Sequence, residues 1–174
     1  VEKLRLIVIS DANLTRENDD RSQGGYFILL AEDEEKDNEE EIFVSILSWK
    51  YWKLKRKAIS SLCAASQAMH EAKDDAIWMR NLIEFMYGVR MEIDLRTDCE
   101  ALQQAAQSTH SVTNSRTRVQ VGSIKEDIEM KEIRGMKHIA GITNPADLLT
   151  KDNSTKVLEI VQTMMSKNRL KYCR

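Results

Sequence analysis

Three aspartates lie at the ends of expected strands or at the start of an expected helix, and carboxylates in such positions can do metal chemistry. Asp11 and Asp98 close two strand-like segments, and Asp147 stands at the start of an expected helix. Neighbouring strands run about 5 Å apart, so carboxylates at their ends can converge. Convergent carboxylates favour a divalent cation such as Mg²⁺ or Mn²⁺, and a pair of such ions ~3.5–4 Å apart can clamp a phosphodiester for attack by water. Taken singly, an aspartate in such a position is more often a turn or cap residue than a metal ligand.

The elements that would position these aspartates follow from hydrophobic periodicity and turn residues. Strands are expected at 4–10, from Gly24 into the following apolar run, at 42–49, at 89–98 and within 132–140; helices are expected at 61–87, 99–107, 116–130, after Pro145 and at 154–170. The acidic stretch 32–41 carries too much like charge to pack, which predicts a solvated loop tip. Three antiparallel strands followed by helix-separated strands predict a mixed sheet with helices packed against it.

Composition narrows the class of protein. The chain has 174 residues, 42% of them apolar and 31% charged, with a formal charge of −2. These values predict one globular domain, no membrane span and no overall basic nucleic-acid binder, although a local basic face stays possible. Three cysteines at unrelated spacings predict neither a zinc site nor a disulfide framework, and favour a reducing compartment. The start at Val1, with no leader pattern, suggests a segment of a longer intracellular polypeptide.

Five stretches in series resemble a known family. They are "SDANLTRENDDRSQGGYFILL", "SILSWKYWKLKRKAISSLCAASQAMHEA", "LRTDCEAL", "SRTRVQVGSIKE" and "TNPADLLTK". Their order and spacing resemble the ribonuclease H domain of copia-type retrotransposon Pol polyproteins. The resemblance runs from Leu6 to Lys151, nearly the whole chain.

The resemblance implies an α/β, ribonuclease H-like fold with a five-stranded mixed sheet flanked by helices. It implies a ribonuclease H-like domain over residues 1–151 and a C-terminal helical extension over 152–174. In the family, four carboxylates bind two Mg²⁺ (or Mn²⁺) ions and cleave the RNA strand of RNA–DNA hybrids. Matched position by position, Asp11, Asp98 and Asp147 are three of these metal-binding, catalytic carboxylates. The implied partners are an RNA–DNA hybrid and the reverse transcriptase portion of the same polyprotein, with a cytoplasmic or nuclear location.

The fourth carboxylate of the family is missing here. The family places a glutamate on the long helix, and "SSLCAASQA" has Ala65 at that position. A shift of register by two residues meets Cys63, whose soft thiol is a poor ligand for Mg²⁺. The next carboxylate, Glu71, lies six residues on, about 600° around the helix and roughly 9 Å along it, so it is a poor substitute. Together with Gln120, where the family carries an aspartate, Ala65 predicts an impaired site.

A basic strip precedes the long helix. Within "WKYWKLKRK", five cations lie among three aromatic side chains, a combination that suits phosphates and bases. The cations predicted to bind nucleic acid are Lys50, Lys53, Lys55, Arg56 and Lys57. The same pattern is equally consistent with solvated lysines at the exit of a strand. His138 is expected to be structural.

These observations leave three hypotheses. The first is a Mg²⁺-dependent RNA–DNA hybrid ribonuclease that is weakened by Ala65. The second is a catalytically inactive nucleic-acid-binding or connecting module that descends from such an enzyme. A general α/β interaction domain is the third, and the ordered series of motifs argues against it.

Overall fold

The computed structural model describes residues 4–14, 22–32, 41–151 and 155–171. Six strands form one sheet: β1 (Leu4–Asn13), β2 (Gln23–Glu32), β3 (Glu41–Lys53), β4 (Glu92–Thr97), β5 (Gly135–His138) and β6 (Arg169–Lys171). The helices are α1 (Ser61–Tyr87), α2 (Glu100–Gln107), α3 (Ser115–Glu129), α4 (Asp147–Thr150) and α5 (Thr155–Lys167), with a 3-10 turn, η1 (Gly141–Thr143). Most of the expected loop tip at 32–41 lies outside the described residues.

The strand order is β5-β4-β1-β2-β3-β6. β1, β2 and β3 pair antiparallel in chain order, whereas β4 lies parallel to β1, and β5 parallel to β4. The sheet is therefore mixed, as the sequence predicts. Because β1 is central and parallel to β4, the ends of β1 and β4 meet at the same edge of the sheet.

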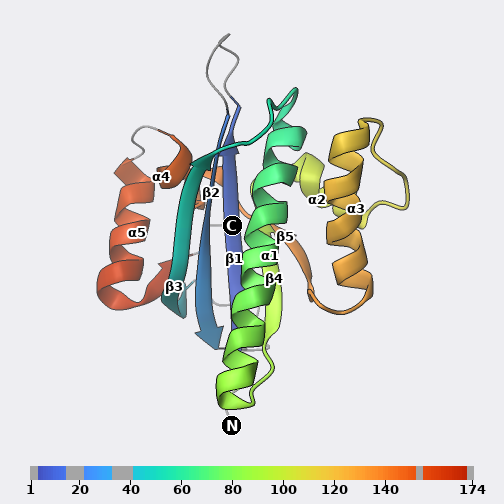
Figure 1. The fold of residues 1–174 in the computed structure, drawn as a ribbon. Coiled ribbons are helices and arrows are strands. Elements are labelled where there is room, and N and C mark those ends of the chain that lie inside the picture. The colour runs from blue at the N-terminus through green and yellow to red at the C-terminus, as the bar shows by residue number, and fades with distance from the viewer. Residues whose placement is uncertain (1–3, 15–21, 33–40, 152–154, 172–174) are drawn as a thin grey trace.

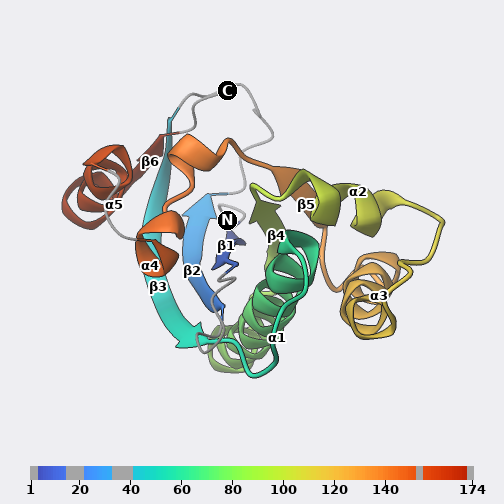
Figure 2. The ribbon, with the colours of Figure 1, turned by 90° about the horizontal axis from the view of Figure 1, so that it is seen from above.

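Helices cover both faces of this sheet (Figures 1 and 2). α1, α2 and α3 pack on one face around a core that includes Leu6, Val8 and Ile93. α4 and α5 pack on the other face, where Ile7, Ile9 and Phe27 form a second core. Consecutive β1 residues face opposite sides of the sheet because side chains alternate along a strand, which is why this central strand is apolar without a break from Leu6 to Ile9.

α1 has the end signals that its sequence predicts. The Ser60 side chain caps the helix by accepting from the Cys63 backbone N–H. Gly88 ends it in the left-handed conformation, with φ of 68°, and donates its N–H to the Glu84 carbonyl. Between these caps the small residues Ala64, Ala68, Ala72 and Ala76 are buried, so the helix backbone lies close to the sheet.

The C-terminal region differs from the prediction of one helix over 154–170. α5 ends at Lys167 because Asn168 adopts a left-handed φ of 54°, which asparagine tolerates better than most residues. β6 then pairs antiparallel with Glu41–Phe43, which makes six strands in the described residues in place of the predicted five. α5 buries Val157 and Val161 against the sheet. The division at residues 151 and 152 stays a prediction.

A buried ion cluster joins three strands of the sheet. Arg5 of β1 donates to the Asp94 carboxylate of β4 at 3.0 Å, and Arg134, just before β5, donates to both oxygens of the same carboxylate at 2.8 and 2.6 Å. Asp94 is 3% exposed, so these two guanidinium groups neutralise a charge that water cannot reach. No helix within the described residues has the length and apolarity needed to cross a membrane.

Candidate metal and nucleic-acid site

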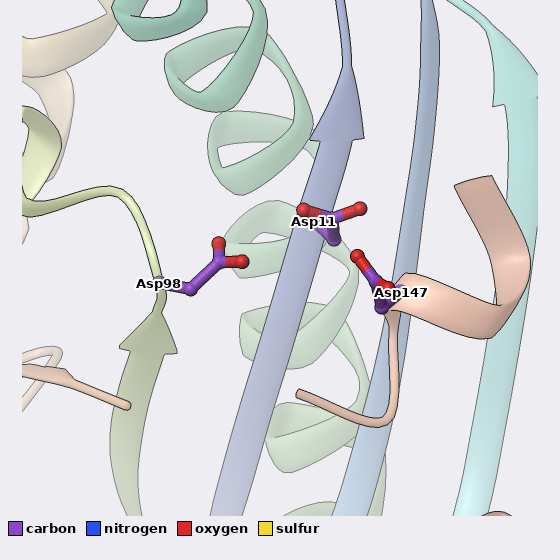
Figure 3. Close-up of side chains that lie close together, drawn as sticks. All are labelled: Asp11, Asp98 and Asp147. Atoms are coloured by element: carbon purple, nitrogen blue, oxygen red, sulfur yellow. The ribbon is translucent and has the colours of Figure 1, made fainter. Parts of the chain in front are cut away.

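The three predicted aspartates meet at one edge of the sheet. Asp11 lies near the end of β1, Asp98 directly follows β4, and Asp147 is the first residue of α4. The parallel register pairs Ser10 with Thr97, which sets Asp11 beside Asp98. One carboxylate oxygen from each aspartate lies within 4.8 Å of the other two, and Figure 3 shows the three side chains directed toward a common space.

α4 is held against β1 and β2 by close backbone contacts. Gly25 pairs with Asp11 across the two strands, and a Cβ at Gly25 would lie 2.6 Å from the Leu149 Cβ. Only glycine therefore allows α4 to approach this closely. The Asn144 side chain donates to the Ser10 carbonyl at 3.3 Å, and the Asn13 side chain donates to the Thr150 carbonyl at 3.3 Å. Asp147 is thus positioned by contacts on both sides of its helix.

The Asp11 carboxylate is the most buried of the three, with 5% exposure. Burial raises its pKa, and the nearby Asp98 and Asp147 carboxylates raise it further, while the Thr150 hydroxyl opposes this by donating to Asp11. The Lys151 ammonium lies 3.7 Å from the Asp11 carboxylate and forms an ion pair with Asp147. Burial lowers the Lys151 pKa, but these carboxylates outweigh it and raise that pKa overall.

This arrangement fits a divalent cation. Three carboxylates and a single ammonium leave an excess of negative charge. The Asp11 pKa is raised first by burial and further by repulsion from the Asp98 and Asp147 carboxylates. Their hard oxygen donors suit Mg²⁺ or Mn²⁺ rather than a soft metal. The acidic triad can hold such an ion, although the donors do not identify which one.

Ala65 leaves the α1 side of this edge without an oxygen ligand. It is 8% exposed and packs in the core on the α1 face, among residues that include Tyr26 and Met69. No α1 carboxylate belongs to the acidic cluster in the described part of the chain. Glu71 instead accepts from Lys50 of β3 at 2.6 Å. The prediction that Glu71 is a poor substitute therefore agrees with its position.

The five predicted nucleic-acid cations do not share one environment. Lys50 pairs with Glu71 and with Asp75, at 2.6 and 3.7 Å, and lies 5.4 Å from the Trp52 ring centre. The other four, Lys53, Lys55, Arg56 and Lys57, are exposed at the end of β3 and in the loop that follows it. Their role in binding nucleic acid stays a prediction.

A cavity of about 450 Å³ lies between the β3–α1 loop, α1 and the start of α3. Arg56, His70 and Arg116 line it together with Ser115, Val119 and Gln120. Gln120 also accepts from the Ser66 hydroxyl at 3.1 Å, which ties α3 to α1 beside the cavity.

The sequence prediction included Arg56 but missed its companions His70 and Arg116. The available signal was Asn114, whose side chain caps α3 by accepting from the Arg116 and Thr117 N–H groups. It marks a helix start that carries an arginine. Thr150 and Lys151, which bind Asp11 and Asp147, were also missed, although both lie in the "ADLLTK" motif.

The amino-acid sequence matches no protein-family model and no curated protein. Solved structures do resemble the fold. LC11-RNase H1, in complex with an RNA/DNA hybrid, has 18% identity and a TM-score of 0.54 over 88% of this chain and 99% of that chain. RNase H1 from the halophilic archaeon Halobacterium salinarum has 17% identity and a TM-score of 0.55 over 89% and 98%. The foamy viral protease-reverse transcriptase, also with an RNA/DNA hybrid, has 10% identity and a TM-score of 0.55 over 91% of this chain and 20% of that longer one. At these identities the likeness concerns the fold, and the chain therefore has the ribonuclease H-like fold.

Proposed function

We propose that the chain is the ribonuclease H domain of a copia-type retrotransposon Pol polyprotein, and that it binds RNA–DNA hybrids. The observation that carries the proposal is the convergence of Asp11, Asp98 and Asp147 within 4.8 Å at one edge of a ribonuclease H-like sheet. The ordered motifs support it, since they include all three residues. The partners follow from this context: the hybrid, and the reverse transcriptase portion of the same polyprotein in the cytoplasm or nucleus.

Asp11, Asp98 and Asp147 are the residues that would hold the divalent ion, Mg²⁺ or Mn²⁺. Such a cation supplies positive charge at a scissile phosphodiester and favours attack by water. Thr150 keeps the buried Asp11 carboxylate oriented by donating a hydrogen bond to it. Lys151 partly neutralises Asp11 and Asp147 and so reduces their repulsion when the ion is absent.

The cavity beside α3 is a candidate contact for the phosphate backbone of the hybrid. Arg56 and Arg116 supply cationic donors, and the N-terminal end of α3 lies at the same place, with two of its N–H groups already bonded to the Asn114 side chain. Backbone phosphates are attracted both by arginines and by the N-terminal end of a helix. We therefore expect one strand of the hybrid to cross α1 between this cavity and the acidic triad.

Ala65 weakens the catalytic part of the proposal. A second ion needs further oxygen ligands, and α1 offers none beside the triad in the described residues. We infer that cleavage is impaired, with hybrid binding retained. An inactive module that binds the hybrid or connects domains is the second candidate, and the same buried alanine favours it.

The test is cleavage of a labelled RNA–DNA hybrid in Mg²⁺ and in Mn²⁺. The variants are Ala65→Glu, the uncharged size match Ala65→Gln, and Asp98→Asn, each compared with the native chain. Hybrid affinity and thermal unfolding are measured on the same samples. This design separates a lost ligand from a lost fold.

We expect Ala65→Glu to cleave at least tenfold faster than the native chain, Ala65→Gln to remain at the native rate, and Asp98→Asn to remove any activity. Retained hybrid binding without cleavage by the native chain would favour the inactive module. Robust native cleavage that survives Asp98→Asn would contradict the proposed site. Absence of hybrid binding by every variant that folds would contradict both candidates.

A further inference from the structure

Lys151 places a side-chain ammonium at the mouth of the acidic triad. The ammonium contacts the Asp147 carboxylate and lies 3.7 Å from the Asp11 carboxylate. Both aspartates are ligands of the divalent cation in the proposed function. The same two carboxylates therefore attract a cation from solution and a cation that the chain itself carries.

The backbone of Lys151 is held beside the site by α4. Lys151 directly follows this helix, and its N–H donates to the Asp147 carbonyl at 3.0 Å. A separation of four residues places the Lys151 side chain over Asp147. The preceding Thr150 donates to Asp11, and α4 approaches Gly25 of β2 closely. The lysine side chain consequently starts from a fixed point next to the triad.

The end of the Lys151 side chain, in contrast, has room to move. This side chain is 45% exposed, whereas those of Asp147 and Asp11 are 14% and 4% exposed. Its flexible four-carbon stem can turn the ammonium outward into water without any movement of the backbone. Asp11 cannot leave in the same way, because β1 pairs with a strand on each side. An arriving ion thus meets fixed oxygens and a movable ammonium.

A divalent ion and this ammonium need the same oxygens. Mg²⁺ binds carboxylate oxygens at ~2.0–2.1 Å, and an ammonium donates to the same lone pairs at ~2.7–2.9 Å. One oxygen from each of the three aspartates lies within 4.8 Å of the other two, so the donors surround one small space. Two cations in that space also repel each other. A bound ion therefore has to displace the Lys151 ammonium or bind against its repulsion.

We propose that Lys151 is an intramolecular competitor of the divalent cation, which neutralises part of the triad in the ion-free chain and lowers the affinity for the ion. The three carboxylates alone carry a charge of −3, and the ammonium reduces this charge to −2. The same contact thus stabilises the ion-free chain and weakens the site. This role rests on the proposed function, because it requires that the triad is a cation site.

A lysine that only positions a ligand would behave differently. If Lys151 served to orient Asp147 for the ion, removal of its charge would lower both the metal affinity and the stability of the ion-free chain. Under competition, removal of the charge raises the metal affinity and still lowers that stability. The two effects have opposite signs only under competition, so measuring both distinguishes the two roles.

Coulomb's law gives the expected size of the effect. In water, a single charge and a divalent ion ~5 Å apart repel each other enough to change the affinity about tenfold. The dielectric constant of water is appropriate because the Lys151 side chain is half exposed. Added salt should reduce the effect, since mobile ions screen exposed charges.

Calorimetric titration with Mn²⁺ and thermal unfolding in chelator test the proposal on the whole chain. Lys151→Met removes the charge and keeps most of the length, whereas Lys151→Arg keeps the charge. Lys167→Met is the matched control, because it removes the charge of an exposed lysine in the last turn of α5.

We expect Lys151→Met to bind Mn²⁺ about tenfold more tightly than the native chain. In chelator, the same variant should unfold roughly 1–3 °C below the native chain, because it loses an exposed ion pair. Lys151→Arg and Lys167→Met should both bind Mn²⁺ within about threefold of the native chain, since each leaves a positive charge beside the triad.

Equal or weaker Mn²⁺ binding by a folded Lys151→Met variant would overturn the proposal and leave the cation site intact. A tenfold gain in Lys151→Arg or in Lys167→Met would overturn it as well, because neither change removes the charge beside the triad. Failure of the proposed function gives a different result. If neither the folded native chain nor Lys151→Met binds Mn²⁺, the triad holds no ion, and the proposed site and the role of Lys151 fail together.

Discussion

Gly25→Ala should displace α4 and with it one ligand of the acidic site. A Cβ at Gly25 would lie 2.6 Å from the Leu149 Cβ and 3.2 Å from the Thr150 Cγ2, whereas carbon atoms in contact are normally ~3.5–4.0 Å apart. The Leu149 Cβ is fixed to the backbone, so α4 has to move by roughly 1 Å. The displacement weakens the Thr150 hydrogen bond to Asp11 and moves Asp147 away from the other two carboxylates.

Gly25→Ala should lower both the stability of the fold and the affinity for Mn²⁺. Overpacking of this kind costs ~1–3 kcal/mol, and at ~2–4 °C per kcal/mol for a chain of this size the midpoint of thermal unfolding should fall by about 6 °C. Ligand distances in metal sites vary by only ~0.2 Å, so a shift of roughly 1 Å should reduce Mn²⁺ affinity at least tenfold. Thermal unfolding in chelator measures the loss of stability, and calorimetric titration with Mn²⁺ measures the loss of metal affinity.

Gly24→Ala is the matched control. A Cβ there would meet Leu54 and Trp52 side-chain atoms at 3.0 Å and the Ala68 Cβ at 3.3 Å, all on the α1 face. We expect Gly24→Ala to lower stability without changing Mn²⁺ affinity. If Gly25→Ala unfolds within about 1 °C of the native chain and binds Mn²⁺ equally well, the close approach of α4 does not position the site.

Two further predictions concern buried carboxylates. Asp94→Ala leaves Arg5 and Arg134 without their shared partner and should cost ~3–5 kcal/mol, which corresponds to a fall of about 10 °C in the unfolding midpoint at ~2–4 °C per kcal/mol; an unchanged midpoint would show that the cluster does not stabilise the sheet. Burial raises the Asp11 pKa above its usual 3.8, so its ionised form destabilises the fold as pH rises through that higher pKa. Asp11→Asn should therefore be more stable than the native chain at pH 7 in chelator, and the difference should disappear as pH falls toward 3.8. Equal unfolding midpoints at both pH values would refute this account.

Much of the fold could be predicted from local patterns. The buried strands, the long helix between Ser60 and Gly88 and the convergence of strand-end aspartates follow from periodicity, caps and the spacing of strands. The β6 strand could not, since its three residues depend on pairing with the distant Glu41–Phe43 segment. The asparagine at position 168, a residue type that tolerates the left-handed conformation found there, is a weak local sign that α5 ends at this point.

Part of the candidate site could likewise be predicted from the sequence, and part could not. Asp11 and Asp98 are visible in the sequence because they end apolar runs, and Asp147 because it follows the Asn144–Pro145 helix-start signal. The closeness of α4 to β2 is not, because it depends on which residue packs over Gly25. The exposed apolar side chains near the end of α1 were also missed: the sequence predicts one helix over 61–87, but it does not show that Trp78, Phe85 and Met86 are exposed. Periodicity identifies an apolar helix without showing how far the sheet extends beneath it.

The central claim is that Asp11, Asp98 and Asp147 hold a divalent cation, and calorimetric titration with Mn²⁺ tests it most directly. The account predicts a single class of site in the native chain that Asp98→Asn weakens at least tenfold, with the fold retained in thermal unfolding. Binding of equal affinity in the native chain and in Asp98→Asn, or no binding by a folded native chain, would contradict it.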